Sequence, residues 1–333
     1  MIRRTLIAIP TLVAISFVIF LILDLAPGDP TSNLPLNIPA EVRDDIRRAL
    51  GLDQPFLIRW LKWMQLMFIN EPIHIIESVF NVCIGDCEAR PRVISWASRA
   101  PALDIIWQRL PQTLWVLGFA FIIGIIIAVP VGVISAYKQY SWFDNFGTFI
   151  STVGFSAPTF FTGLLAIVVF SVWLGWFPSY YNTTLVVNSW DTLVEQMKQM
   201  IMPVAVLSLF NAAALSRFTR ASVLDNLNED YVRTARSKGL RENKVVVTHV
   251  VRNSMIPVIT LIALQIPGIF AGAIITEQIF RINGLGQLLI VSIGQSDVPM
   301  VQTLTFIFAV LTVVFNLVAD VTYGFLDPRI RYD

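Results

Sequence analysis

Six long apolar stretches constrain this chain more than any other feature of its sequence. They are Thr5–Leu25, Gln112–Ala136, Phe146–Phe177, Ile201–Ser216, Met255–Ile275 and Val301–Leu326. A helix needs roughly 20 apolar residues to cross the hydrocarbon core of a bilayer, which is about 30 Å thick. Ile201–Ser216 is the shortest and needs flanking residues such as Met200, and Phe146–Phe177 is broken near Pro158. The sequence therefore predicts an all-α membrane protein with six transmembrane helices.

Composition supports a membrane protein and excludes several other classes. Of the 333 residues, 55% are hydrophobic and only 14% are charged, whereas soluble domains carry about 25% charged residues. The net charge of +1 argues against a nucleic-acid-binding protein. The first apolar stretch resembles a signal peptide, but it is too long and lacks a small-x-small cleavage site, so we expect it to be retained.

The distribution of basic residues predicts the orientation. Short cytoplasmic loops are enriched in Lys and Arg. The polar segment between the fourth and fifth stretches holds Arg217, Arg220, Arg233, Arg236, Lys238, Arg241, Lys244 and Arg252. The short segments 178–200 and 276–300 hold only Lys198 and Arg281. We therefore expect both ends of the chain in the cytoplasm and a multi-pass protein of the cell membrane.

These spans divide the chain into four parts. We expect a first transmembrane helix over 1–25 and an extracytoplasmic segment with amphipathic helices over 26–111. A core domain of five transmembrane helices follows over 112–326, and a cytoplasmic tail over 327–333. Two amphipathic helices are predicted in the second part, Pro39–Leu50 and Pro55–Phe68.

Two cysteines, Cys83 and Cys87, lie in the predicted outer segment. A disulfide between them is chemically possible on that side of the membrane. Two unpaired thiols are the alternative, because connectivity does not follow from sequence. With only two histidines in addition, the chain offers no predicted metal site and no catalytic constellation.

The polar segment between the fourth and fifth spans contains the strongest functional pattern. Residues 230–238 favour a helix, Gly239 permits the left-handed backbone that ends one, and 240–251 resumes a helix. Tyr231, Thr234, Ala235 and Lys238 share one helical face, on which the small Ala235 would let a partner backbone approach closely. The alternative is a basic amphipathic helix lying on lipid. The chain has no GxxxxGK[ST] phosphate loop, so another chain would hydrolyse any ATP.

This segment resembles the EAA loop of the membrane subunits of ATP-binding-cassette (ABC) importers. That family has Glu-Ala-Ala-x-x-x-Gly where this chain has residues 233–239, and only Ala235 and Gly239 match. The flanking Asp230-Tyr231-Val232 and His249-x-x-Arg252-Asn253 are instead similar to the dipeptide/oligopeptide (nickel) permease branch. Residues 3–30, 50–55, 109–114 and 326–332 resemble the same branch, so the similarity covers nearly the whole chain. The segment 70–104 is longer than that branch leads us to expect.

The resemblance implies a type I ABC importer-like permease with cytoplasmic coupling helices, which forms half of a pathway for di- or oligopeptides. Its coupling residues for the ATPase would be Asp230, Tyr231, Thr234, Ala235, Lys238 and Gly239. The implied partners are two ATPase subunits, a second homologous permease, an extracytoplasmic substrate-binding protein and membrane lipid. ATP and Mg²⁺ would bind the ATPases, so this chain would carry no cofactor and would not itself be an enzyme. Alternatives are an oligosaccharide or nickel cargo, or an ATP-independent secondary transporter.

Polar residues inside the spans are candidates for the translocation pathway, because they are costly in lipid unless they face a cavity or a partner. These are Ser156, Thr159, Gln265 and Asn316. For Ser156 and Thr159, a hydrogen bond between helices is the alternative. The outer segment 277–286, followed by an expected helix over Leu285–Ile293, resembles a family segment near the pathway entrance. Contact with the binding protein and a plain interfacial helix remain the two interpretations.

Overall fold

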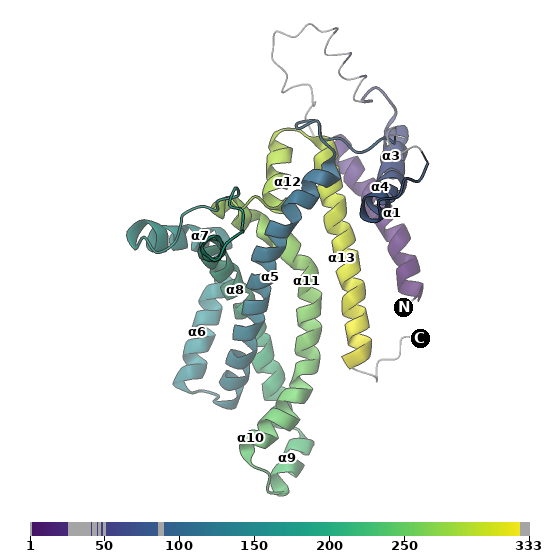
Figure 1. Cartoon of the computed structure of the whole chain (residues 1–333). Helices are drawn as coiled ribbons and strands as arrows, with labels where there is room; N and C mark the ends of the chain where they lie inside the picture. The colour runs from purple at the N-terminus through teal and green to yellow at the C-terminus, as the bar shows by residue number, and fades with distance from the viewer. Residues whose placement is uncertain are drawn as a thin grey trace. The chain divides into compact units, whose positions relative to one another are not determined.

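The computed structural model describes residues 2–25, 51–85 and 90–326, together with residues 41, 45 and 48 (Figure 1). The chain divides into two compact units. Unit 1 comprises residues 1–111 and 288–311, and unit 2 comprises residues 112–287 and 312–333. Most of the first predicted amphipathic helix, Pro39–Leu50, and all of the predicted tail over 327–333 lie outside the described residues.

The described part of the chain is built from helices, with a single isolated bridge between Ile94 and Pro101. The N-terminal elements are α1 (Ile2–Leu25), α3 (Phe56–Gln65), the π-helical turn η2 (Leu66–Asn70), α4 (Glu71–Phe80), α5 (Ala102–Tyr137) and α6 (Trp142–Ser156). The central elements are α7 (Thr159–Ala166), η3 (Ile167–Trp173), α8 (Trp190–Leu227), α9 (Asp230–Ser237), α10 (Glu242–Lys244) and η4 (Val245–Val251). The last are α11 (Arg252–Phe280), α12 (Leu285–Gly294) and α13 (Val298–Leu326).

Aromatic side chains hold unit 1 together. The ring of Phe17 on α1 lies edge-on against Trp60 of α3, with centroids 5.3 Å apart. Trp63 packs in the same way on Phe306 of α13, also at 5.3 Å. The amphipathic helix predicted over Pro55–Phe68 is confirmed as α3 and η2, and its buried face carries Trp63 and Met67.

An ion network joins described residues of the long segment 70–104 within unit 1. Arg92 donates hydrogen bonds to Glu71 of α4 at 3.0 Å and to Asp104 of α5 at 2.8 Å. Glu71 is buried and also accepts the backbone N–H of Val93 at 3.0 Å. Asp297, at the start of α13, accepts the N–H of Trp96 at 3.0 Å. The sequence indicates no role for this segment. Its described residues are bonded to α4, to α5 and to Asp297 beside α13.

Five of the six predicted spans are confirmed as single helices, and the remaining one is a sharply bent pair of helices. Five described helices are long and apolar enough to cross a membrane, and the pair α6 and α7–η3 makes a sixth when counted as one span. This pair bends by 103° at Pro158, where the sequence predicts a break. Ala157 has the extended backbone that a residue before proline favours, and this ends α6.

The fourth span is longer than predicted. The sequence predicts a span over Ile201–Ser216, yet α8 has 38 residues. It begins at a capping box in which Ser189 and Thr192 satisfy each other's backbone N–H groups. Its far end stays helical to Leu227 because many of its side chains are buried against other elements of unit 2.

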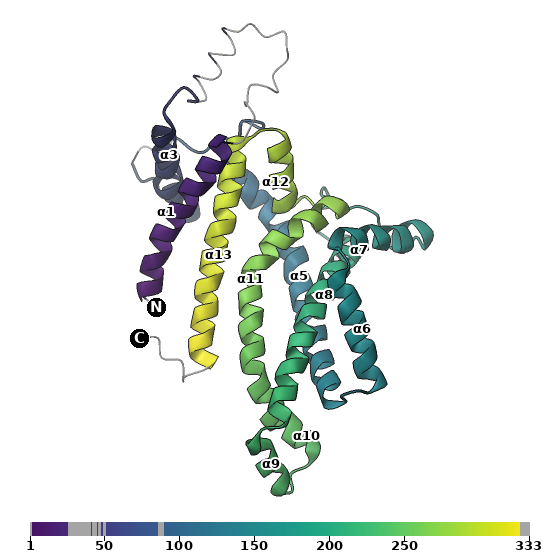
Figure 2. The same cartoon turned by 180° about the vertical axis from the view of Figure 1, so that it is seen from behind.

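In unit 2, α8 packs against α6, α7 and α11, and against α5 where glycine allows a close approach. A Cβ added at Gly132 of α5 would lie 2.6 Å from the backbone oxygen of Ser216 on α8. Small residues permit such approaches between helices in a membrane. Figures 1 and 2 show α9 and α10 at the ends of α8 and α11, on the side of unit 2 remote from α7.

Candidate functional site

Helix α9 presents a polar outer face and a small apolar inner one. The exposed side chains are Asp230, Arg233, Thr234, Arg236 and Ser237, together with Lys238 at the C-cap. The inner face consists of Val232, which is fully buried, and Ala235, which is 6% exposed. The expectation that Ala235 faces a partner is therefore wrong. It faces its own chain, because this short helix has only two apolar side chains with which to anchor itself.

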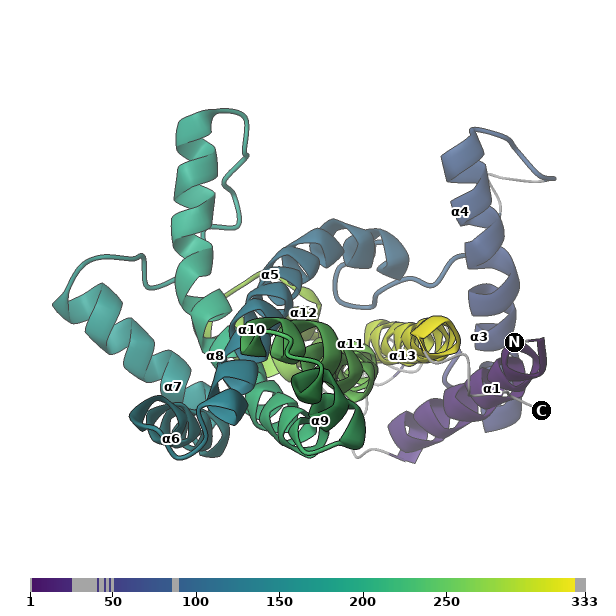
Figure 3. The same cartoon turned by 90° about the horizontal axis from the view of Figure 1, so that it is seen from below.

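The inner face of α9 belongs to a cluster that joins four elements of unit 2. Val232 and Ala235 pack with Ala136 of α5, Val223 of α8, and Val245 and Val250 of η4. All six are buried. Figure 3, viewed from the end that carries α9, shows α9 and α10 in front of α8 and α11. A close-packed cluster transmits displacement instead of absorbing it, so α9 cannot shift without moving these helices.

Gly239 ends α9 as predicted, in a Schellman motif. Its φ of +73° lies in the left-handed region that favours glycine. The N–H of Gly239 donates to the carbonyl of Arg236 at 2.9 Å, and that of Leu240 donates to the carbonyl of Ala235 at 3.4 Å. These two bonds satisfy carbonyls that the helix end leaves free. A Cβ added at Gly239 would meet nothing within 4 Å, so the backbone conformation, and not crowding, requires glycine.

An ion pair closes the turn after Gly239. Arg236 of α9 donates to Glu242 of α10 through Nη2 at 2.7 Å and through Nε at 3.2 Å. The hydrogen bond with Glu242 raises the pKa of the Arg236 guanidinium above its ordinary value. Both side chains are exposed to water, and such pairs contribute modestly to stability. The pair links α9 to the helical run that follows the turn.

The second helix of the predicted pair is not a separate helix. The sequence predicts one over 240–251, but helical backbone continues from Glu242 through η4 and α11 to Phe280. Val245 and Val250 are buried by α9 and α8 on one side of this run. The coupling element is thus one short helix seated on the beginning of the fifth span.

One further contact attaches the coupling region to α8, and an ion pair joins α8 to α6. The hydroxyl of Tyr231 donates to the side-chain oxygen of Asn226 near the end of α8, so Tyr231 is half-buried and does not extend fully toward a partner. Arg220 of α8 binds Asp144 of α6 through two hydrogen bonds, of 2.7 and 2.8 Å. No local pattern in the sequence indicates the second pair, because its members lie 76 residues apart.

A second polar cluster surrounds Glu277 at the end of α11. Its carboxylate is buried and accepts hydrogen bonds from the Thr113 hydroxyl at 2.7 Å and from the N–H groups of Gly286 and Gln287 at 2.7 and 3.0 Å. The last two amides belong to the first turn of α12, where negative charge is favourable. The expected helix over Leu285–Ile293 is confirmed as α12. Glu277 and residues 284–286 are buried, so a partner protein would reach only exposed residues of this segment such as Gln278 and Arg281.

The four predicted pathway residues occupy different elements. Ser156 and Thr159 flank the bend between α6 and α7, Gln265 lies on α11, and Asn316 lies on α13. Ser156 and Asn316 are exposed, whereas Thr159 and Gln265 are half-buried. Within the described residues none of the four makes a side-chain hydrogen bond. Their role in a pathway remains a prediction.

The predicted disulfide lies partly outside the described residues. Cys83 follows α4 and is disulfide-bonded in the structure, whereas Cys87 is not among the described residues. The pairing of these two cysteines remains a prediction. No cluster of three His, Cys, Asp or Glu side chains that could hold a metal ion occurs within the described ranges.

Comparison with known proteins gives consistent matches along the whole chain. Residues 128–332 match the family described as binding-protein-dependent transport system inner membrane component, and residues 1–117 match the N-terminal family of the same membrane components. The chain is 39% identical over 332 residues to the oligopeptide transport system permease protein AppB of Bacillus subtilis, which covers 99% of this chain and 98% of that protein. It is 36% identical, with the same coverage, to the glutathione transport system permease protein GsiC of Escherichia coli K12.

The fold also resembles a solved structure. A crystal structure of an amino acid ABC transporter with histidines aligns with a TM-score of 0.52 and 14% sequence identity. The alignment covers 68% of this chain and 95% of that one. At this identity the likeness concerns the fold, which is that of an ABC transporter membrane subunit.

Proposed function

This chain belongs to the family of binding-protein-dependent transport system inner membrane components, and on this premise we propose that α9 is the docking site for a separate ATPase subunit. We also propose that the cargo is peptide. Family membership makes the chain a multi-pass protein of the cell membrane and the permease component of an ABC importer. Such an importer also contains an ATPase and a binding protein. The observation that carries the docking proposal is the polar outer face of α9, held on the ends of three other elements.

The docking surface consists of Asp230, Arg233, Thr234, Ser237 and Lys238. It lies in the predicted cytoplasmic loop, where the positive-inside rule puts the basic residues. Val232 and Ala235 couple this surface to α5, α8 and η4. Because η4 continues into α11, a push on α9 would tilt three spans together, α5, α8 and α11, as rigid-body alternating access requires.

Charge reversal on the outer face tests the docking proposal. Arg233→Glu combined with Lys238→Glu should reduce co-purification of the ATPase at least about tenfold, because it replaces charges that a complementary partner surface has to match. Both side chains are exposed, so insertion and folding should persist. Lys138→Glu, at an exposed residue directly after α5, is a control that changes charge in the same predicted compartment. Undiminished co-purification of the double variant would contradict the proposal.

The remaining assembly is proposed from membership of the family, and the sequence itself contains no nucleotide loop. We propose that ATP and Mg²⁺ bind two separate ATPase subunits and that a second homologous permease completes the pathway. Quantitative mass measurement of the purified complex tests this composition. A complex that lacks either a second permease or a pair of ATPases would refute it.

The peptide cargo is proposed from the relatives, whose names specify oligopeptides and glutathione, itself a small peptide. Oligosaccharides and nickel are the alternatives within the same architecture. Uptake of labelled di- to pentapeptides into cells with and without this chain tests the cargo, with oligosaccharide and Ni²⁺ uptake measured in parallel. Uptake into vesicles driven by a proton gradient without ATP would instead indicate a secondary transporter.

A further inference from the structure

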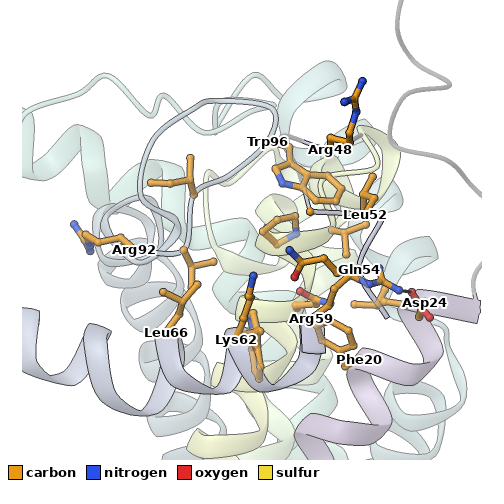
Figure 4. A pocket seen from close by; sticks show the side chains of 18 of the residues that line it. Phe20, Asp24, Arg48, Leu52, Gln54, Arg59, Lys62, Leu66, Arg92 and Trp96 are labelled. Atoms are coloured by element: carbon orange, nitrogen blue, oxygen red, sulfur yellow. Dashed lines mark hydrogen bonds and ion pairs between the residues drawn. The ribbon is translucent and has the colours of Figure 1, made fainter. Parts of the chain in front are cut away.

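A basic pocket opens in unit 1 beside the end of the first span (Figure 4). Its volume is about 630 Å³. The walls come from α1, α3, the loop that precedes α5 and the start of α13, and every lining residue belongs to unit 1. The docking proposal for α9 makes no use of this pocket.

Positive charge dominates the walls. Among the described residues that line it, the cations are Arg48, Arg59, Lys62, Arg92 and Arg99, and the only acid is Asp24. Arg59 is paired with Asp24, and Arg48 and Arg92 have acid partners of their own. Lys62 and Arg99 form no ion pair within the described part of the chain. Figure 4 shows Lys62 directed into the space below Trp96, whereas Arg48 points away.

Two buried donors of the same walls lack acceptors. The Nε of Arg59 and the indole N–H of Trp63 are buried and have no hydrogen-bond partner among the described residues. A buried donor without an acceptor is unfavourable, and native proteins leave few such groups unexplained. A group with several anionic oxygens bound in the pocket would supply acceptors to both donors. The same oxygens would neutralise Lys62 and Arg99.

The position and the apolar walls of the pocket indicate where such a group comes from. Asp24 is the next-to-last residue of the first span, Leu6–Leu25, so the pocket lies at the depth where α1 leaves the hydrocarbon. Phe20, Leu23 and Leu66 line it beside the cations. Trp63 also lines it, and tryptophan is enriched at this interfacial depth. A phosphate group joined to apolar chains matches both kinds of wall, whereas a free anion would leave the apolar part unmatched.

We propose that this pocket binds the phosphate headgroup of an anionic phospholipid in the leaflet at which α1 ends. Lys62 and Arg99 supply the countercharge, Arg59 and Trp63 donate hydrogen bonds to the phosphate oxygens, and the glycerol and first methylenes lie against Phe20 and Leu23. The bound lipid fills the junction between the first span, the amphipathic α3 and the start of α13. The proposal requires that the chain is embedded in a membrane, and it does not depend on the peptide cargo.

The test uses the complete transporter complex, delipidated in detergent and titrated with phosphatidylglycerol, phosphatidylcholine or inorganic phosphate. Native mass spectrometry measures the bound lipid. The wild-type complex should bind phosphatidylglycerol more tightly than phosphatidylcholine. Lys62→Gln and Arg99→Gln should each weaken phosphatidylglycerol binding about fivefold, because each removes one cation near the membrane surface. The double variant should weaken it by about the product of the two effects.

Lys198→Gln serves as the matched control, because Lys198 is exposed, lies outside the pocket and sits in a predicted outer segment. It should leave lipid binding unchanged. The midpoint of thermal unfolding in detergent without added lipid should be equal for all variants, which separates loss of binding from loss of fold. Equal affinity for the two lipids, or no loss in the double variant, would overturn the proposal. Inorganic phosphate that displaces phosphatidylglycerol at equal concentration would also overturn it, in favour of a soluble anion.

Discussion

Thr113 and Glu277 lie 164 residues apart in the sequence and meet in a buried hydrogen bond of 2.7 Å. The Thr113 hydroxyl also accepts the N–H of Leu285 at 2.8 Å, while Glu277 accepts those of Gly286 and Gln287. One carboxylate and one hydroxyl therefore satisfy the first three amides of α12. Through Thr113, α5 thus holds the turn that joins α11 to α12.

The charge of Glu277 should be required for this arrangement. Glu277→Gln keeps the size of the side chain but loses the carboxylate, and only one of its two polar atoms can accept. We expect the free energy of unfolding of the purified complex to fall by about 2 kcal/mol, because hydrogen bonds to a buried charged group are among the stronger ones. Gln278→Ala, at the exposed neighbouring residue, is the control. Equal unfolding midpoints for the two variants would show that the network is not stabilising.

The close approach of α5 to α8 should make Gly132 intolerant of even one methyl group. A Cβ there would lie 2.6 Å from the Ser216 backbone oxygen and 2.6 Å from the Thr219 side chain. Gly132→Ala should cost about 1–3 kcal/mol, the range for overpacking. Gly118→Ala on the same helix meets nothing within 4 Å and should be neutral or stabilising by up to about 1 kcal/mol, because alanine favours helix. Thermal unfolding of both variants measures the difference, and a similar loss for both would contradict the packing argument.

Substitutions at Gly239 should affect ATPase binding in an order set by backbone conformation. The φ of +73° costs a residue with a Cβ about 1 kcal/mol, and asparagine tolerates it better than other residues. We expect ATPase co-purification to decrease in the order Gly, Asn, Ala, Val. Gly51→Ala, a left-handed glycine far from α9 in the sequence and equally uncrowded, is the control. If Gly239→Asn and Gly239→Val bind the ATPase equally, the left-handed turn is not what positions α9.

The loop after α4 should lose its order in acid. Glu77 accepts hydrogen bonds from Arg90 at 2.6 Å and from the N–H of Ile84 at 2.9 Å. The bond with Arg90, followed by that with Ile84, lowers the pKa of Glu77 below its ordinary value of 4.5. A carboxyl whose pKa is lowered by folding stabilises the fold above its unfolded pKa, and the effect is lost as the pH falls through the lower native value.

Hydrogen exchange of the Ile84 amide checks this prediction. Its protection should be constant from neutral pH down to about 4.5 and should fall below it. In Glu77→Gln the protection should be weak at every pH, because the charged partner of Arg90 is gone. Protection that falls at low pH equally in both proteins would assign the effect to another group.

Local signals are enough to establish the class of this protein. Apolar stretches of span length, the proline at the third span and the basic loop between the fourth and fifth are each readable within a few tens of residues. The end of α9 at Gly239 and the helix over Leu285–Ile293 can be recognised in the same way. At Pro158 the sequence predicts a break but not the bend of 103°, because a proline alone does not determine the bend angle.

Which side chains meet depends on the three-dimensional packing of the helices. Ala235 turns inward, against the expectation, because the cluster around Val223 and Val245 offers the apolar surface that α9 has to bury. The pairs Thr113–Glu277 and Asp144–Arg220, and the pocket that joins α1 to α3 and the start of α13, depend on contacts between distant parts of the chain. Periodicity and local composition do not predict such contacts, since they indicate where the helices form and not how the helices pack together.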